Sequence, residues 1–230
     1  MKKLLAASLL STTAAMASAQ TVPPPSGVLS LSAQAVTEVP TDVVQLTLAA
    51  EQEGPEPSAI SNALSTRTQA ALAQAKRVSG VEAQSGGFTI HPNTDRNGKI
   101  STWRGRSEIV LKSKDFAAVS KLAGELANQM QVQNISFSLS REARQAAEQK
   151  LEDQAVAAFR DKAQATTKLF GYNGYTIREV SVNESGGVMP PMPRMYAAKA
   201  MSADAGAPIP VEGGKAQVTV SVNGSVQMVK

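Results

Sequence analysis

Polar and hydrophobic residues recur along this chain with two periods, and the longest run of helical period lies between Ser140 and Gly171. On a helical wheel of about 100° per residue, its small and apolar residues form one stripe centred on Leu151, with Lys162 the one charge inside it. The stripe comprises Ala147, Leu151, Ala155, Ala158, Ala165, Thr166 and Leu169, widened by Phe159 and Phe170. Ser140 is placed to cap the first turn, and Gly171 to end the helix in a left-handed conformation. We predict a scaffold helix roughly 45 Å long that packs closely on a sheet.

Other segments alternate polar and apolar residues, which is typical of strands with one wet face. They lie at about 29–35, 44–50, 88–90, 103–111, 135–139, 175–182 and 216–222. Asn97-Gly98 predicts a hairpin turn between two of them. The alternation slips near Arg178 and Glu179, as it does at a β-bulge.

Two shorter helices are predicted between these strands. Pro57 suits a first helical position, and an apolar stripe follows it at helical spacing as far as Gly80: Ile60, Leu64, Ala71, Ala75 and Val78. Ser113 is placed to cap the second helix. The stripe of that helix consists of Phe116, Val119, Leu122, Leu126 and Met130.

After the first strand the predicted order is β-α-β-β-α-β-α-β-β. This order contains two β-α-β-β units, at about 43–112 and 132–229, joined by the helix at 114–130; the repeat is one of pattern and not of residues. Hairpins interrupt the alternation of strands and helices, which argues against a doubly wound sheet. The predicted fold class is α+β, with largely antiparallel sheets and helices packed on one face.

The N-terminus has the pattern of a secretory signal peptide. Lys2 and Lys3 precede a short apolar run, and Ala17-Ser18-Ala19 offers a cleavage site before Gln20. The apolar run is far shorter than the ~20 residues that span a membrane, and no later stretch is apolar enough. We predict a signal peptide at 1–19, a proline-rich arm at 20–27 and, at 28–230, one large domain or two small lobes, in a soluble periplasmic protein.

Charge and composition narrow the function classes. Removing Lys2 and Lys3 reduces the 23 basic residues to 21 against 19 acidic ones, a net charge of +2. The remaining basic residues are scattered and have few aromatic neighbours, which argues against a nucleic-acid groove. Because the chain has no cysteine, a core formed by roughly 210 mature residues must supply its stability.

The residues that could carry catalysis are few. His91 is the only histidine, so one chain can form neither a histidine metal cluster nor a paired-histidine acid/base system. Ser85 and Ser101 lie in the same predicted hairpin, but neither sits in a nucleophile-elbow sequence. The paired carboxylates Glu152-Asp153 fall on the solvated side of the long helix. We therefore predict no catalytic residue, no cofactor and no enzyme.

The segment 185–214 is long, has no sustained period and is rich in Pro, Met, Ala and Gly. Loops of this length are uncommon in compact domains unless they are functional or disordered. Met189, Met192 and Met195 could gather a soft ion such as Cu(I), although Arg194 places a positive charge among them. Methionines are also adaptable contact residues, and we interpret the segment mainly as a flexible loop or an interface loop.

Several segments resemble the SIMPL domain family, also called DUF541. They are Thr37–Val44, Ser85–Ile90, Ile135–Leu139, the long helix closing in Leu169-Phe170-Gly171, Val180–Ser185 and the proline-rich stretch before the last strand. The segments are individually loose, and their order and spacing carry the resemblance over about 28–229. It implies an exported α+β protein that forms ring-like or channel-like oligomers, with no established catalytic motif.

Residues and resemblance together lead to one expectation, an exported non-enzymatic periplasmic homo-oligomer, with protection in oxidative or envelope stress as its hypothetical role. The alternative is a periplasmic binding module for a small ligand or a soft metal ion, the ion bound through the Met-rich loop. Trp103, the lone tryptophan, is the one residue that suggests a pocket for a small ligand.

Overall fold

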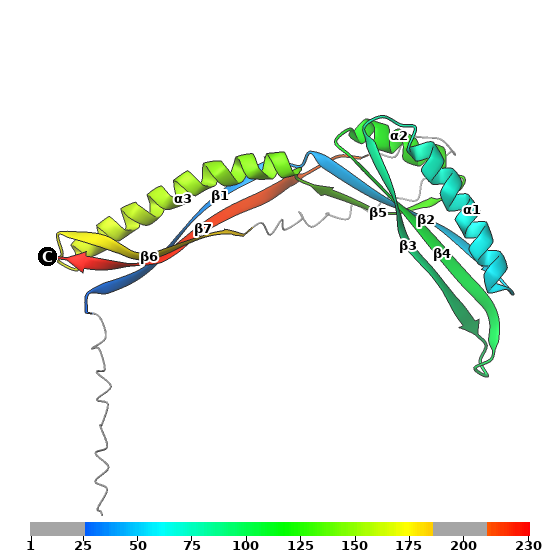
Figure 1. The fold of residues 1–230 in the computed structure, drawn as a ribbon, viewed down its shortest axis with the longest axis horizontal. Helices are drawn as coiled ribbons and strands as arrows, with labels where there is room; N and C mark the ends of the chain where they lie inside the picture. The colour runs from blue at the N-terminus through cyan, green and yellow to red at the C-terminus, as the bar shows by residue number, and fades with distance from the viewer. Residues whose placement is uncertain (1–25, 186–210) are drawn as a thin grey trace, which may run out of the picture.

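The structure is a computed structural model that describes residues 26–185 and 211–230. Its elements form two lobes joined end to end in a shallow arch (Figure 1). In chain order they are β1 (Val28–Pro40), β2 (Val43–Gly54), α1 (Pro57–Ala75), β3 (Val81–Thr94), β4 (Ile100–Ser113), α2 (Phe116–Leu126), β5 (Gln131–Ser138), α3 (Arg141–Leu169), β6 (Gly174–Ser185) and β7 (Lys215–Val229). The predicted order of strands and helices is confirmed.

Each lobe contains one antiparallel sheet. One has four strands in the order β3-β4-β2-β5, and the other has three in the order β1-β7-β6. The fold class α+β is confirmed. The partners of two strands could not be read from the order: β5 joins the sheet of the first β-α-β-β unit, and β1 lies beside β7 in the other sheet.

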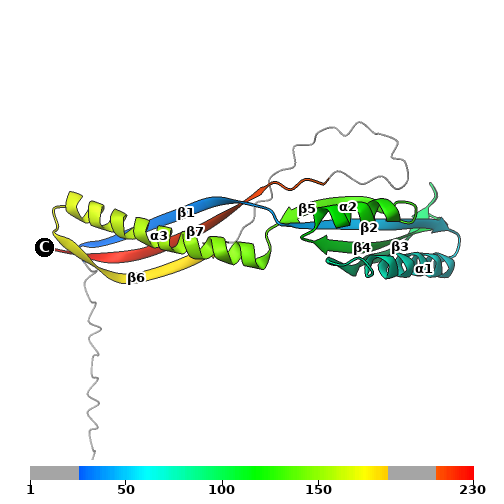
Figure 2. The same ribbon diagram turned by 90° about the horizontal axis from the view of Figure 1, so that it is seen from above.

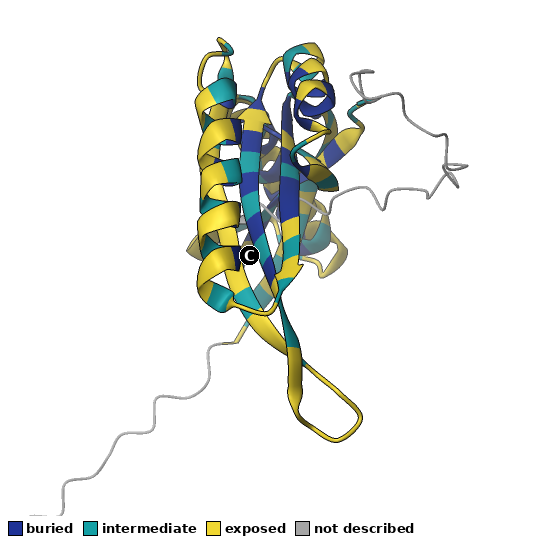
Figure 3. Ribbon diagram, turned by 90° about the vertical axis from the view of Figure 1, so that its right-hand side faces the viewer, coloured by how far each residue is buried: buried dark blue, intermediate teal, exposed yellow. Residues whose placement is uncertain are grey.

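In the four-stranded lobe, α1 and α2 cover the same face of the sheet (Figures 1 and 2). The predicted stripe of α1 is confirmed, since Ile60, Leu64, Ala71 and Ala75 are buried against β2 and β4. Figure 3 shows the buried residues where helices meet strands, whereas the far end of the β3–β4 hairpin is exposed. Asn97-Gly98 turns this hairpin as predicted, with Gly98 at φ 77°.

In the three-stranded lobe, α3 packs on one face of the sheet. Its buried residues follow a strict four-residue repeat: Leu151, Ala155, Phe159, Ala163 and Thr167. Four residues turn a helix by about 400°, so this line of contact rotates by about 40° at each step. Figure 2 shows the consequence, because α3 crosses the strands diagonally.

The stripe predicted for α3 is therefore correct near Leu151 and wrong toward its end. Ala158 and Ala165 are exposed, and Leu169 and Phe170 are 86% and 63% exposed. A fixed face on a helical wheel assumes a straight line of contact, whereas a twisted sheet makes that line rotate. Ala163 and Thr167 consequently replace the predicted residues.

The ends of the helices test the predicted caps. Ser140 caps α3, accepting a hydrogen bond from the Ala143 N–H at 3.2 Å, and Gly171 follows the helix at φ 78°. Ser113 does not cap α2 as predicted. Asp115 does, accepting from the Ala118 N–H at 2.9 Å, while the Ser113 hydroxyl donates to the Gly80 carbonyl. The helix starts later than the sequence suggested because Asp115 is the residue with extended backbone before its first turn.

The chain crosses between the lobes where β1 leads into β2, where β5 leads into α3, and where 211–214 leads into β7. The Thr41 N–H and hydroxyl both donate to the Gly214 carbonyl at 2.9 Å. A Cβ on Gly213 would lie 2.7 Å from Thr41 Oγ1 and 2.9 Å from the Phe116 ring, so only glycine fits there. The three crossings are packed against one another.

Asp42 connects two of these crossings. Its N–H donates to the Ser138 carbonyl, and its two carboxylate oxygens accept from the Ser140 N–H and hydroxyl, each at 2.6 Å. Burial raises the pKa of the Asp42 carboxyl, but the hydrogen bonds from Ser140 and the charge of Lys114 outweigh it and hold the pKa below its usual value. The contacts between the lobes therefore stabilise the ionised carboxylate of Asp42.

Several predictions concern residues outside the described ranges. The signal peptide at 1–19, most of the arm at 20–27, and Met189, Met192 and Met195 all lie there.

The packing of α3 predicts opposite effects for two leucines. Leu151→Asp places an unpaired charge in the core and should lower the free energy of unfolding by several kcal/mol. Leu169→Asp, which the sequence stripe placed on the same face, should change it by less than about 0.5 kcal/mol because Leu169 is exposed. Thermal unfolding followed by circular dichroism compares the two. Equal losses would mean that α3 is not packed as described.

The junction predicts a pH-dependent effect. Asp42→Asn should cost about 1 kcal/mol at pH 7, because a charged acceptor of two hydrogen bonds is lost from a partly exposed site. Since the folded-state pKa is lowered, the stabilisation is fully present above the unfolded-state pKa of about 3.9 and is lost as the pH falls through the folded-state value.

Denaturant unfolding of the parent and Asp42→Asn from pH 7 to pH 3 measures this difference. Glu142→Gln is the matched control, because Glu142 is the other carboxylate that contacts Lys114 and is exposed. Its effect should be small at every pH. A difference for Asp42→Asn that does not shrink below about pH 4 contradicts the assignment.

Candidate functional site

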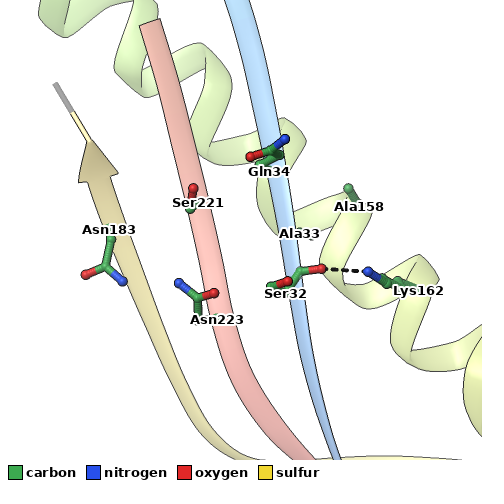
Figure 4. Close-up of a pocket in the computed structure, with 8 residues that line it drawn as sticks. All are labelled: Ser32, Ala33, Gln34, Ala158, Lys162, Asn183, Ser221 and Asn223. Atoms are coloured by element: carbon green, nitrogen blue, oxygen red, sulfur yellow. Dashed lines mark hydrogen bonds between the residues drawn. The ribbon is translucent and has the colours of Figure 1, made fainter. Parts of the chain in front are cut away.

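A hollow with a volume of about 980 Å³ involves the face of the three-stranded sheet that α3 leaves open. Figure 4 shows its polar side chains on neighbouring strands, with Gln34 from β1, Ser221 and Asn223 from β7 and Asn183 from β6. Strand register explains the cluster, because Gln34, Ser221 and Asn183 form one cross-strand row. We call this surface the polar groove.

The polar groove offers hydrogen bonds but little else. Its amides and hydroxyls can donate and accept, and its one charged residue is Lys162, which reaches round from α3 and donates to the Ser32 carbonyl at 2.9 Å. Its described lining includes no carboxylate, histidine or cysteine. The amides and hydroxyls of the described lining suit hydrogen bonds with a neutral polar partner or with water.

A second polar surface covers the open face of the four-stranded sheet. Arg106 lies at its centre, contacting Glu51 at 3.0 Å and Glu108 at 2.8 Å, and these bonds raise the pKa of its guanidinium, the bond to Glu108 most. Hydrogen bonds from Thr102 and Asn93 lower the pKa of Glu53 beside it. The charges of this network are paired with one another, which is the pattern of a structural ion-pair network.

The third unusual surface is apolar. β6 carries Ile177, Val180 and Val182 on the face that α3 covers elsewhere, and they are 53%, 39% and 38% exposed. Their neighbours in the sheet, Val226 and Val222 on β7, are buried. The diagonal course of α3 leaves this part of β6 uncovered (Figure 2). We call Ile177, Val180 and Val182 the β6 strip.

The family model SIMPL, described as a protein of unknown function (DUF541), matches residues 29–226. The chain belongs to the SIMPL family. The match covers both lobes and confirms the resemblance seen in the sequence. No curated protein matches the chain, and the description of the family assigns it no activity.

The catalytic candidates of this SIMPL chain do not meet. His91 is exposed on β3 opposite Arg104, and Ser85 lies on the same strand opposite Ile109. The Ser101 hydroxyl donates to the Asn93 carbonyl. Among the described residues no hydrogen bond joins His91 to either serine, so the geometry contains no nucleophile and base pair.

The structure also places the residues that the sequence suggested for binding a ligand or a metal ion, where it describes them. Trp103 packs against the core of the four-stranded lobe and does not line the polar groove. Glu152 and Asp153 are exposed on α3. Within 26–185 and 211–230, no group of three His, Asp or Glu residues is placed to hold a metal ion, and no described helix is both long and apolar enough to cross a membrane. The hypothesis of a soft-metal site at Met189, Met192 and Met195 concerns residues outside these ranges.

Sequence analysis missed both the polar groove and the β6 strip in this SIMPL protein. The groove exists only because β1, β7 and β6 are neighbours, although they lie far apart in the sequence. The strip had a signal, since Val180 and Val182 alternate with Ser181 and Asn183. Alternation predicts which residues share a face, but it does not say whether a helix covers that face.

Proposed function

We propose that this SIMPL protein is an exported, non-enzymatic periplasmic protein that acts as a homo-oligomer. The observation that carries this proposal is the β6 strip, whose three apolar side chains are exposed along one strand and on one face of the sheet. Monomeric proteins rarely leave contiguous apolar surface in water unless it is a contact site. A neighbouring subunit would bury it.

The chemistry of the described surfaces supports a non-enzymatic role. The described lining of the polar groove holds no acid/base pair, and the Arg106 guanidinium is paired with the carboxylates of Glu51 and Glu108. Both surfaces suit contact with a partner or with solvent better than a reaction. We also propose protection in oxidative or envelope stress as the role of the assembly.

Export is supported by the N-terminal pattern of Lys2-Lys3, a short apolar run and Ala17-Ser18-Ala19. Protein recovered from the periplasm of an expressing bacterium should therefore begin at Gln20. Intact-mass spectrometry measures this directly. Replacing Ala17 and Ala19 with bulky residues is the matched control, since it should block cleavage, and a periplasmic protein that retains Met1 contradicts the proposal.

Light scattering on size-exclusion peaks tests the assembly. The mature protein should elute as a multiple of the monomer mass. A variant in which 187–210 is replaced by a Gly/Ser linker of equal length keeps Val211, which packs on the core of the four-stranded lobe. We expect this variant to form a smaller or less stable oligomer, because the replaced residues include apolar and methionine side chains suited to contacts.

Two outcomes contradict different parts of this proposal. A monomeric parent at all accessible concentrations contradicts the homo-oligomer. An oligomeric parent with an equally stable oligomeric variant contradicts only the contribution of the segment 187–210.

A further inference from the structure

β6 is the outer strand of the three-stranded sheet, and its free edge has no described neighbour. In Figure 2 it runs along the margin of the lobe, with β7 on its inner side. Its 12 residues give roughly 40 Å of edge at about 3.3 Å per residue. An uncovered edge of this length presents unpaired N–H and C=O groups and is a template for another strand.

The opposite edge of the same sheet, β1, is protected. Lys162 occupies the outward carbonyl of Ser32 at 2.9 Å. The apolar side chains of β1 that face α3, such as Leu31 and Ala33, are half-buried against the core of this lobe. The edge formed by β6 differs in both respects, since no such contact covers it among the described residues and its apolar side chains are exposed.

We propose that β6 pairs antiparallel with β6 of a second copy of this chain, about a two-fold axis normal to the sheet. This proposal rests on the homo-oligomer proposed above and specifies one of its contacts. It joins two three-stranded sheets into one six-stranded sheet in the order β1-β7-β6-β6-β7-β1. Such a contact is self-complementary, as a two-fold contact must be.

The symmetry brings like surfaces together. A two-fold axis normal to a sheet keeps each face on its own side, so the β6 strips of both copies adjoin on the face that carries α3. The two α3 helices then flank the joined strips. α3 lies diagonally across each sheet, and its C-terminal half runs away from β6 (Figure 2).

The side chains favour one register. Residues that face each other on the same side of the sheet must keep the two-residue alternation. When the pair is centred on Ser181, Val180 of each copy lies opposite Val182 of the other copy, which gives two valine pairs. This register also places Asn183 opposite Glu179 of the other copy on the open face, where the amide can donate to the carboxylate.

Neighbouring registers are worse. Centring on Val180 places Val182 opposite Arg178, a cation beside an apolar side chain. A β6-to-β1 contact would instead place the β6 strip beside an edge whose apolar side chains α3 already covers. The register centred on Ser181 is the one that pairs both valines with apolar partners.

Cysteine cross-linking tests this register cleanly, because the chain has no cysteine of its own. In Ser181→Cys the new thiols face each other across the axis, and directly opposed residues of antiparallel strands have Cα atoms about 4.5–5.5 Å apart, within the range that a disulfide requires. We expect most of the mature Ser181→Cys protein to become a disulfide-linked dimer under mild oxidation, as seen on a non-reducing gel.

Ser30→Cys is the matched control, since Ser30 is an exposed serine on β1, on the same open face but at the other edge. It should give only background dimer. The two variants are also mixed and oxidised together. If the disulfides mainly join position 181 of one variant to position 30 of the other, the contact is head-to-tail, and the two-fold contact is overturned.

A second pair of variants avoids oxidation. The double variant Val180→Lys with Val182→Lys should lower the oligomer mass measured by light scattering, while the circular dichroism of its monomer stays unchanged. Val36→Lys, at an exposed valine of β1, is the control and should leave the oligomer mass unchanged. An oligomeric parent with no Ser181→Cys dimer, or with a mass unchanged in the double lysine variant, overturns this contact and leaves the homo-oligomer standing. A monomeric parent overturns both.

Discussion

The position of one lobe relative to the other depends on the hydrogen bonds between Asp42 and Ser140. Ser140 caps α3 and at the same time donates twice to Asp42, which leads directly into β2. One side chain therefore fixes the start of the helix of one lobe relative to the central strand of the other. Sequence patterns within each lobe would allow many relative placements, and this contact, with Thr41 against Gly214, selects one.

Local features of the fold could be predicted and long-range ones could not. The caps at Ser140 and Gly171, the turn at Asn97-Gly98 and the bulge near Arg178 all depend on neighbouring residues, and each was predicted. Which strands pair depends on contacts between distant segments. Nothing in the sequence of β5 distinguishes pairing with β2 from pairing with β6 or β7, because all four have alternating apolar residues.

The same division explains the sites. His91 and Trp103 stood out in the sequence as rare residues, yet the described geometry joins neither into a site. Met189, Met192 and Met195 lie outside the described ranges. The polar groove and the β6 strip consist of common residues, Ser, Asn and Val, whose meaning depends on their neighbours. The diagonal line of contact from Leu151 to Thr167 decides which part of β6 remains uncovered, so the surface of the lobe follows from how its helix packs.

The size of the β6 strip limits how strong a contact it can form alone. Each partly exposed Val or Ile that becomes buried contributes about 1 kcal/mol, half or less of the value for full burial. Three such residues from each copy contribute several kcal/mol, comparable with the estimated 4–15 kcal/mol that association costs in lost freedom. The backbone hydrogen bonds of the shared edge would then decide the balance. A pair formed only through β6 would therefore dissociate on dilution, and a stable assembly would need further contacts elsewhere on the chain.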